Sequence, residues 1–212
     1  MNPTVLRRLA LFDVVGMTLL VQWFIWRLQF DAPHSWIIFP VWITASFLLH
    51  RDKPKTLGWR ADNLWAATKQ SVLPFLLFAA VCVAVGWWLD EFKRLPPNWV
   101  APRRLWLYFA FCLLQQVALQ SFLNNRLMLL APNRWLSSVL TGLIFGVSHL
   151  PNPVLVPVTF VGGVVMARLF ATQRNVIPLA IGQALLCSLV WACFPIAWHH
   201  FLRVGPGYYR WP

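Results

Sequence analysis

Acidic residues are scarce in this 212-residue chain, which has 6 Asp and Glu against 18 Lys and Arg. Charged residues of both signs make up 11% of the chain, compared with about 25% in an average soluble domain. Because 59% of the residues are hydrophobic, the composition excludes an intrinsically disordered chain. Long apolar stretches recur along the whole sequence and argue against a soluble globule. The composition therefore predicts an integral membrane protein with several spans.

The sequence patterns typical of zinc, redox and nucleic-acid sites are also missing. The four cysteines form no CxxC pair, so neither a zinc site nor a redox site is indicated. The cations lie in short gaps between apolar runs, as in the loops of membrane proteins, and do not gather on one polar surface. We therefore expect no nucleic-acid partner and no cofactor, and a divalent metal has little support.

Seven apolar runs approach the length of about 20 residues that a membrane-spanning helix needs. They lie near residues 9–30, 35–50, 70–89, 104–130, 135–150, 153–172 and 176–202. The runs at 35–50 and 135–150 are short, so each could be tilted, half-inserted or broken. The sequence thus predicts an all-α, polytopic helical membrane bundle of about seven transmembrane helices. We expect one integral membrane domain over residues 1–212, surrounded by a lipid bilayer.

The side of the membrane follows from the basic residues. Lys and Arg are more numerous in the loops on the side of the N-terminus, which predicts a cytoplasmic N-terminus. We expect a multi-pass protein of a bacterial inner membrane.

The run at 104–130 is unusually polar for a span, and polar groups inside spans are candidates for function. It carries Gln115, Gln116, Gln120, Asn124 and Arg126. In an α-helix three of these amides, spaced by four residues, share one face. One interpretation is hydrogen bonding between helices, worth about 0.6 kcal/mol per contact. The number of amides exceeds what packing usually requires and favours a polar cavity.

Two later runs carry further polar candidates. His149 ends the fifth run just before a Pro-Asn-Pro turn that contains Asn152, and taken alone such a histidine is more often a structural residue than a functional one. Gln183 and Cys187 lie four residues apart in the seventh run, on one face of a helix. We expect Asn124, Arg126, Asn152, Gln183 and Cys187 to contribute to the cavity.

In order and spacing these residues resemble the motifs of the CAAX-processing and bacteriocin-processing (CPBP) intramembrane endopeptidases, the family of the Ras-converting enzyme. The family pattern is Glu-Glu-x-x-x-Arg, then Phe-x-x-x-His, then His-x-x-x-Asn or Asp. The corresponding segments here read Gln115-Gln116-x-x-x-Gln120, Phe145-x-x-x-His149 and Gln183-x-x-x-Cys187. The resemblance covers residues 104–190, the motif-bearing core. It implies an intramembrane peptidase fold in which these positions would hold and activate water, with His149, Gln115, Gln116 and Gln120 at the catalytic positions.

The departures from the family pattern bear directly on activity. A glutamine side chain stays neutral and cannot accept a proton as a glutamate can. Gln120 lacks the charge of an arginine, and Gln183 can replace a histidine neither as base nor as a good metal ligand. Among these catalytic groups only His149 is retained.

Three functions stay open at this point. The favoured one is a catalytically impaired or inactive relative that holds a peptide or a membrane partner in a polar intramembrane cavity. The alternative is an active membrane endopeptidase that uses His149 and a water. A pathway for a small solute or lipid is the third.

Three further polar residues have no assigned role. Asp13 is the only acid inside a span, and it could extend toward the membrane surface, pair with an arginine, or couple to His149. His199 and His200, near the end of the seventh run, are expected at the membrane interface.

Overall fold

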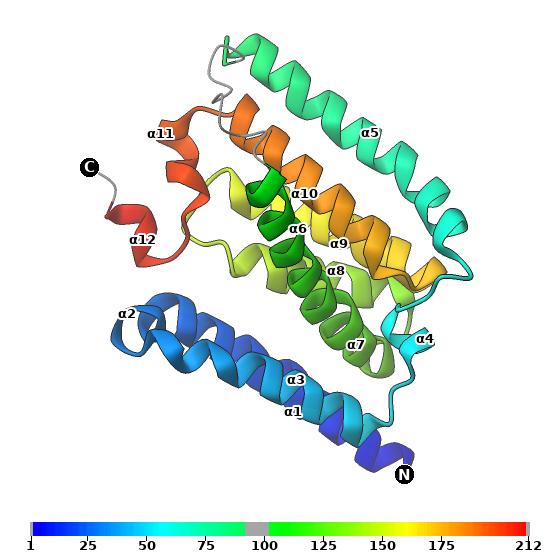
Figure 1. Ribbon diagram of the computed structural model, residues 1–212. Helices are drawn as coiled ribbons and strands as arrows, with labels where there is room; N and C mark the ends of the chain where they lie inside the picture. Colours follow the sequence, from blue (N-terminus) through cyan, green and yellow to red (C-terminus); the bar gives the residue numbers. More distant parts are fainter. Residues whose placement is uncertain (1, 92–101, 211–212) are drawn as a thin grey trace.

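The computed structural model describes residues 2–91 and 102–210, and the regular elements in these ranges are all helices (Figure 1). The longer ones are α1 (Pro3–Trp23), α3 (Ile38–His50), α5 (Leu64–Trp88), α6 (Pro102–Gln116), α8 (Arg134–Val147), α9 (Leu155–Gln173) and α10 (Val176–Cys193). Each of the seven apolar runs forms a helix, so the predicted all-α bundle is confirmed.

Five of the helical stretches in the described ranges are long and apolar enough to cross a membrane. They are Pro3–Asp31, Leu64–Trp88, Trp106–Leu130, Leu155–Gln173 and Val176–Cys193. The predicted count of about seven is not confirmed, because α3 and α8, the two short runs, have only 13 and 14 residues. Large apolar side chains such as Leu114, Trp87 and Trp88 are well exposed on the outside. The chain is an integral membrane protein whose outer surface suits a lipid environment.

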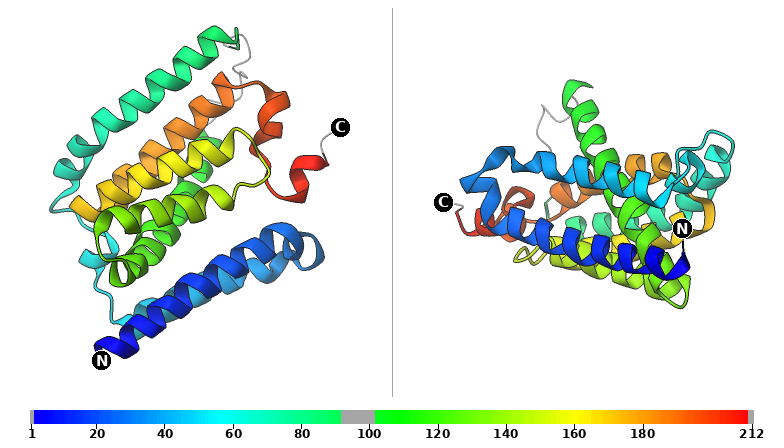
Figure 2. Two further views of the ribbon diagram at one scale, coloured as in Figure 1. Left: turned by 180° about the vertical axis from the view of Figure 1, so that it is seen from behind. Right: turned by 90° about the horizontal axis from the view of Figure 1, so that it is seen from below.

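The helices form two groups (Figures 1 and 2). α8 and α9 pack tightly because Gly142 and Gly163 face each other, and a Cβ on Gly163 would lie 2.9 Å from the Gly142 Cα atom. α10 packs against α5 and α6 to complete the main bundle. α1 and α3 form a hairpin beside this bundle, which it contacts mainly through α7 (Asn125–Leu130).

A π-helix, η5 (Val117–Asn124), joins α6 to α7. The sequence predicted a continuous α-helix here, and the structure corrects that expectation over eight residues. A π-helix has a wider turn, so residues beyond it face directions that α-helical spacing does not predict. Stretches of this kind are rare and often accompany functional sites.

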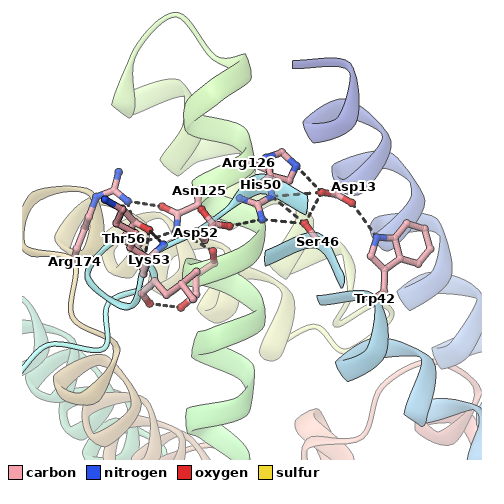
Figure 3. Close-up of polar contacts among 12 residues, drawn as sticks. Asp13, Trp42, Ser46, His50, Asp52, Lys53, Thr56, Asn125, Arg126 and Arg174 are labelled. Atoms are coloured by element: carbon pink, nitrogen blue, oxygen red, sulfur yellow. Dashed lines mark hydrogen bonds and ion pairs between the residues drawn. The ribbon is translucent and has the colours of Figure 1, made fainter. Parts of the chain in front are cut away.

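A buried network of charged and polar side chains fastens the hairpin to α7 (Figure 3). Asp13 of α1, only 2% exposed, accepts hydrogen bonds from Trp42 Nε1 (3.0 Å) and Ser46 Oγ (2.6 Å) of α3. His50 Nε2 lies 3.1 Å from the same carboxylate. The carboxylate therefore ties α1 to α3 at several points.

Arg126 completes this network from the side of α7. Its guanidinium lies 2.6 Å from Asp52 Oδ2 and 3.4 Å from Asp13 Oδ2, and it also donates to Ser46. Asp13 thus pairs with an arginine, and the considered couple with His149 is wrong. Arg126 lies in this network and not beside Gln115, because the π-helix changes the direction in which it points.

Residues 195–210, which we name the strap, cross the end of the main bundle. They include the short helices α11 (Ile196–His199), η6 (His200–Leu202) and α12 (Pro206–Tyr209). In Figure 1 the strap runs from the end of α10 toward the turn of the hairpin. The three residues of η6 have positive φ angles of 43°, 57° and 59°. Left-handed backbone costs about 1–2 kcal/mol per non-glycine residue, so the strap is strained there.

Candidate functional site

A cavity of about 380 Å³ lies between α5, α6, α8, α9, α10 and the strap. Most of its wall is apolar and aromatic. The polar side chains on the wall are Tyr108, Gln115, His149, Thr159, Gln183 and Cys187. Within the described part of the chain, no Asp, Glu, Lys or Arg lines this cavity. The cavity therefore suits an uncharged ligand with a few hydrogen-bonding groups.

A chain of glutamine amides connects α6 to α10 at the cavity wall. Gln116 Nε2 donates to Gln183 Oε1 at 2.6 Å, and Gln183 Nε2 donates to Gln115 Oε1 at 2.5 Å. Gln116 also donates to the Met166 sulfur at 3.1 Å. The two motif segments are thus in direct contact, although 67 residues separate Gln116 from Gln183. Among the described residues Gln115 Nε2 has no hydrogen-bond partner, so this N–H group remains available to a ligand.

His149 presents one ring nitrogen to the cavity. Its Nδ1 atom lies 2.7 Å from the Phe145 carbonyl oxygen, and its ring meets the Phe145 ring edge-on with centroids 4.8 Å apart. A carbonyl oxygen can only accept, so Nδ1 must donate and Nε2 must carry the lone pair. In its neutral form His149 therefore has Nε2 as a hydrogen-bond acceptor that is able to take a proton.

A second cavity of about 440 Å³ lies between the hairpin and the bundle elements α6, η5 and α8. It is lined largely by apolar side chains of these elements. The two cavities share the wall residues Phe111, Gln115, Phe145, His149 and Val204. An apolar groove therefore leads to the histidine from the side of the hairpin.

Gln120 and Asn124 lie away from both cavities. Asn124 Nδ2 donates to Gln120 Oε1 at 3.1 Å and to the Ala167 carbonyl oxygen of α9 at 3.0 Å. Both side chains are fully buried. The predicted row of amides therefore divides: Gln115 reaches the cavity, whereas these two link helices, as in the packing interpretation.

Asn152 also lies outside the cavity wall. Its Oδ1 atom accepts from the backbone N–H groups of Val154 and Leu155 and caps the start of α9. Its Nδ2 atom donates to the carbonyl oxygens of His199 (2.8 Å) and Arg203 (2.9 Å) in the strap. The prediction that Asn152 contributes to the cavity is therefore wrong, because its side chain is used up by α9 and the strap, and nothing in the sequence indicated the partners in the strap.

The two histidines of the strap have internal partners. His199 is fully buried, with Nε2 3.1 Å from the Phe194 carbonyl oxygen, whereas the sequence placed it at the membrane interface. Burial lowers the pKa of His199 below its usual value. His200 stacks on Tyr208 with ring centroids 4.1 Å apart.

The donor set of the cavity does not fit a catalytic divalent metal. His149 and Cys187 are the metal-binding side chains on its wall, and catalytic zinc sites take three protein ligands. In the described ranges no group of three His, Cys, Asp or Glu side chains lies close enough to hold an ion.

Comparison with known proteins gives a match to one family model. Residues 96–189 match the family model described as type II CAAX prenyl endopeptidase Rce1-like. The matched range includes all three motif segments and the whole chain of glutamine amides. No curated protein and no solved structure shows a significant match to the chain. Residues 96–189, a little under half of the chain, are thus similar to the Rce1-like type II CAAX prenyl endopeptidases, and this match supports the resemblance to the CPBP family.

Proposed function

We propose that this protein holds an uncharged peptide segment in the cavity and is catalytically impaired. The observation that supports this proposal is the chain Gln116–Gln183–Gln115, which occupies family motif positions with neutral amides that bond to each other. Amide hydrolysis needs a group that removes a proton from water and groups that stabilise the developing oxyanion. His149 offers the first, but among the described residues the wall has no carboxylate to assist it and no cation to strengthen the second, which is left to neutral donors such as Gln115 Nε2.

The free groups of the cavity match a peptide bond. Gln115 Nε2 can donate to a carbonyl oxygen, and His149 Nε2 can accept from an N–H group. The apolar groove that meets the cavity at His149 accommodates the neighbouring apolar side chains of the bound segment. We infer that the ligand is a peptide or a segment of a membrane partner that enters from the bilayer.

The binding test uses the purified protein in detergent and a pool of fluorescent, capped, uncharged apolar hexapeptides. A matched pool with N-methylated peptide bonds lacks the N–H groups that His149 would accept. We expect the N-methylated pool to bind about tenfold more weakly, as for the loss of one hydrogen bond. His149→Ala should remove this difference. Equal binding of both pools by the wild-type protein would contradict the proposal.

A slow endopeptidase is the second candidate, because His149 Nε2 carries a lone pair on the cavity side. Mass spectrometry of the same pool distinguishes the two. Cleavage that depends on His149 would favour the endopeptidase, whereas binding without cleavage would favour the impaired form.

We also propose that the N-terminus faces the cytoplasm of a bacterial inner membrane. The support is the group of cations at the end of the hairpin near the N-terminus, which includes Arg51, Lys53, Lys55 and Arg60. A fluorescent-protein fusion at the N-terminus should fluoresce, and an alkaline phosphatase fusion there should be inactive. The reverse result would contradict this orientation.

A further inference from the structure

The strap forms one wall of the cavity. Phe201 and Leu202 line it together with His149 and Gln183, and Val204 borders both cavities. Any movement of the strap would therefore change access to the polar wall.

Hydrogen bonds from the loop between α8 and α9 hold the strap on the bundle. The amide of Asn152 donates to the carbonyl oxygens of His199 and Arg203, the residues on either side of the three left-handed ones. One side chain thus fixes both ends of the strained turn. The Gly205 N–H group donates to the Leu150 carbonyl oxygen at 2.7 Å and provides the next attachment.

Gly205 also rests directly on the hairpin. Its φ angle is +57°, and a Cβ atom there would lie 2.9 Å from the Ile25 backbone oxygen. Arg210 lies over the Phe30 ring at 4.3 Å from its centroid. The strap therefore bridges the main bundle and the hairpin, at the place where the groove between them meets the cavity.

We propose that the strap is a lid on the cavity, with Asn152 as its latch. The left-handed turn persists because the latch holds both of its ends, and release of the latch lets the turn relax and uncovers the cavity. The lid acts on access alone, so it operates whether the cavity binds or hydrolyses peptides.

The test measures access to Cys187, which lines the cavity and is a free cysteine. In a background with Cys82, Cys112 and Cys193 changed to Ala, N-ethylmaleimide labels Cys187 alone. Asn152→Asp keeps the acceptor that caps α9 but loses the two N–H groups that hold the strap. We expect labelling about tenfold faster or more, because at least one hydrogen bond is lost.

A second variant opens the lid from its other side. Gly205→Ala brings a methyl group against the Ile25 backbone at a positive φ angle, so we expect it also to speed labelling. Gly207→Ala is the matched control in the same strap, because a Cβ atom there meets nothing within 4 Å. Wild-type rates in both Asn152→Asp and Gly205→Ala would overturn the proposal. Faster labelling in Gly207→Ala equal to that in Gly205→Ala would also overturn it.

Discussion

Single residues decide what the cavity can do. The side chains at the family motif positions of α6 and α10 are in contact. The spacing of the three motifs in the sequence predicted that these helices would contribute to one cavity. Since Gln115, Gln116 and Gln183 are neutral, the same geometry supports hydrogen bonding and not proton transfer. The motif positions therefore keep their arrangement in space, although the side chains that occupy them can no longer transfer protons.

Arg126 shows where reasoning about one residue from sequence fails. Its partners Asp13 and Asp52 are distant in the sequence, and an intervening π-helix changes the direction of its side chain. No periodic pattern contains that information. Asp13, by contrast, could be recognised from sequence as an acid that needs a partner inside a span.

Loss of the Asp13 carboxylate should destabilise the protein strongly. Asp13→Asn leaves the buried guanidinium of Arg126 and the ring of His50 without that partner. Breaking a buried ion pair costs about 3–5 kcal/mol in the free energy of unfolding when it leaves a charge without a partner, and since Asp52 still pairs with Arg126 we expect a loss near the lower end of that range. Thermal unfolding in detergent measures the effect. Asp52→Asn is the control, since Asp52 is more exposed than Asp13. It should lower the midpoint temperature of unfolding less than Asp13→Asn does. An equal or larger decrease in Asp52→Asn would contradict the greater importance of Asp13.

Helices could be predicted from the sequence wherever contact with lipid requires a long apolar run. Each apolar run became a helix, and the two runs recognised as short are the two helices too short to span a membrane. The π-helix and the strap were not predictable, because tertiary contacts determine both. The strap depends on Asn152, a residue 47 positions away from its partner His199.

The strap should respond to acid through His199. Its Nε2 atom donates to the Phe194 carbonyl oxygen, so Nδ1 is the acceptor for the Leu202 N–H group at 3.3 Å. Protonation of Nδ1 removes that acceptor. Burial lowers the pKa of His199 from 6.5, and backbone hydrogen bonds, first of all to Phe194, and the charge of Glu91 oppose this shift. A lowered pKa in the folded state means that the contact is fully stable above pH 6.5 and weakens as the pH falls below it.

Electron paramagnetic resonance of a spin label at Gly207→Cys, with the four native cysteines changed to Ala, measures this response. We expect a narrower line at acidic pH than at neutral pH, since the weakened strap moves more freely. His199→Gln cannot titrate and should show the same line at both values. A wild-type line independent of pH would contradict this role of His199.

At the scale of the whole molecule, the hairpin and the bundle enclose a path from the bilayer to His149. The buried network fixes the hairpin at the end near α7, and the strap closes the gap at the other end. The groove between them is mostly apolar, and Gln115 and His149 are on its wall where it meets the main cavity. This arrangement suits a ligand that enters from lipid and is held by few hydrogen bonds.

The central claim is that neutral amides, and not the shape of the cavity, limit hydrolysis. The most direct measurement is mass spectrometry of the capped hexapeptide pool after incubation with the wild-type protein and with Gln115→Glu, Gln116→Glu, Gln183→His. The variant supplies proton-exchanging groups worth about 10²–10⁴-fold in rate. The account predicts no cleavage above background by the wild-type protein and cleavage by the variant that is lost on adding His149→Ala. Rapid, His149-dependent cleavage by the wild-type protein would contradict it.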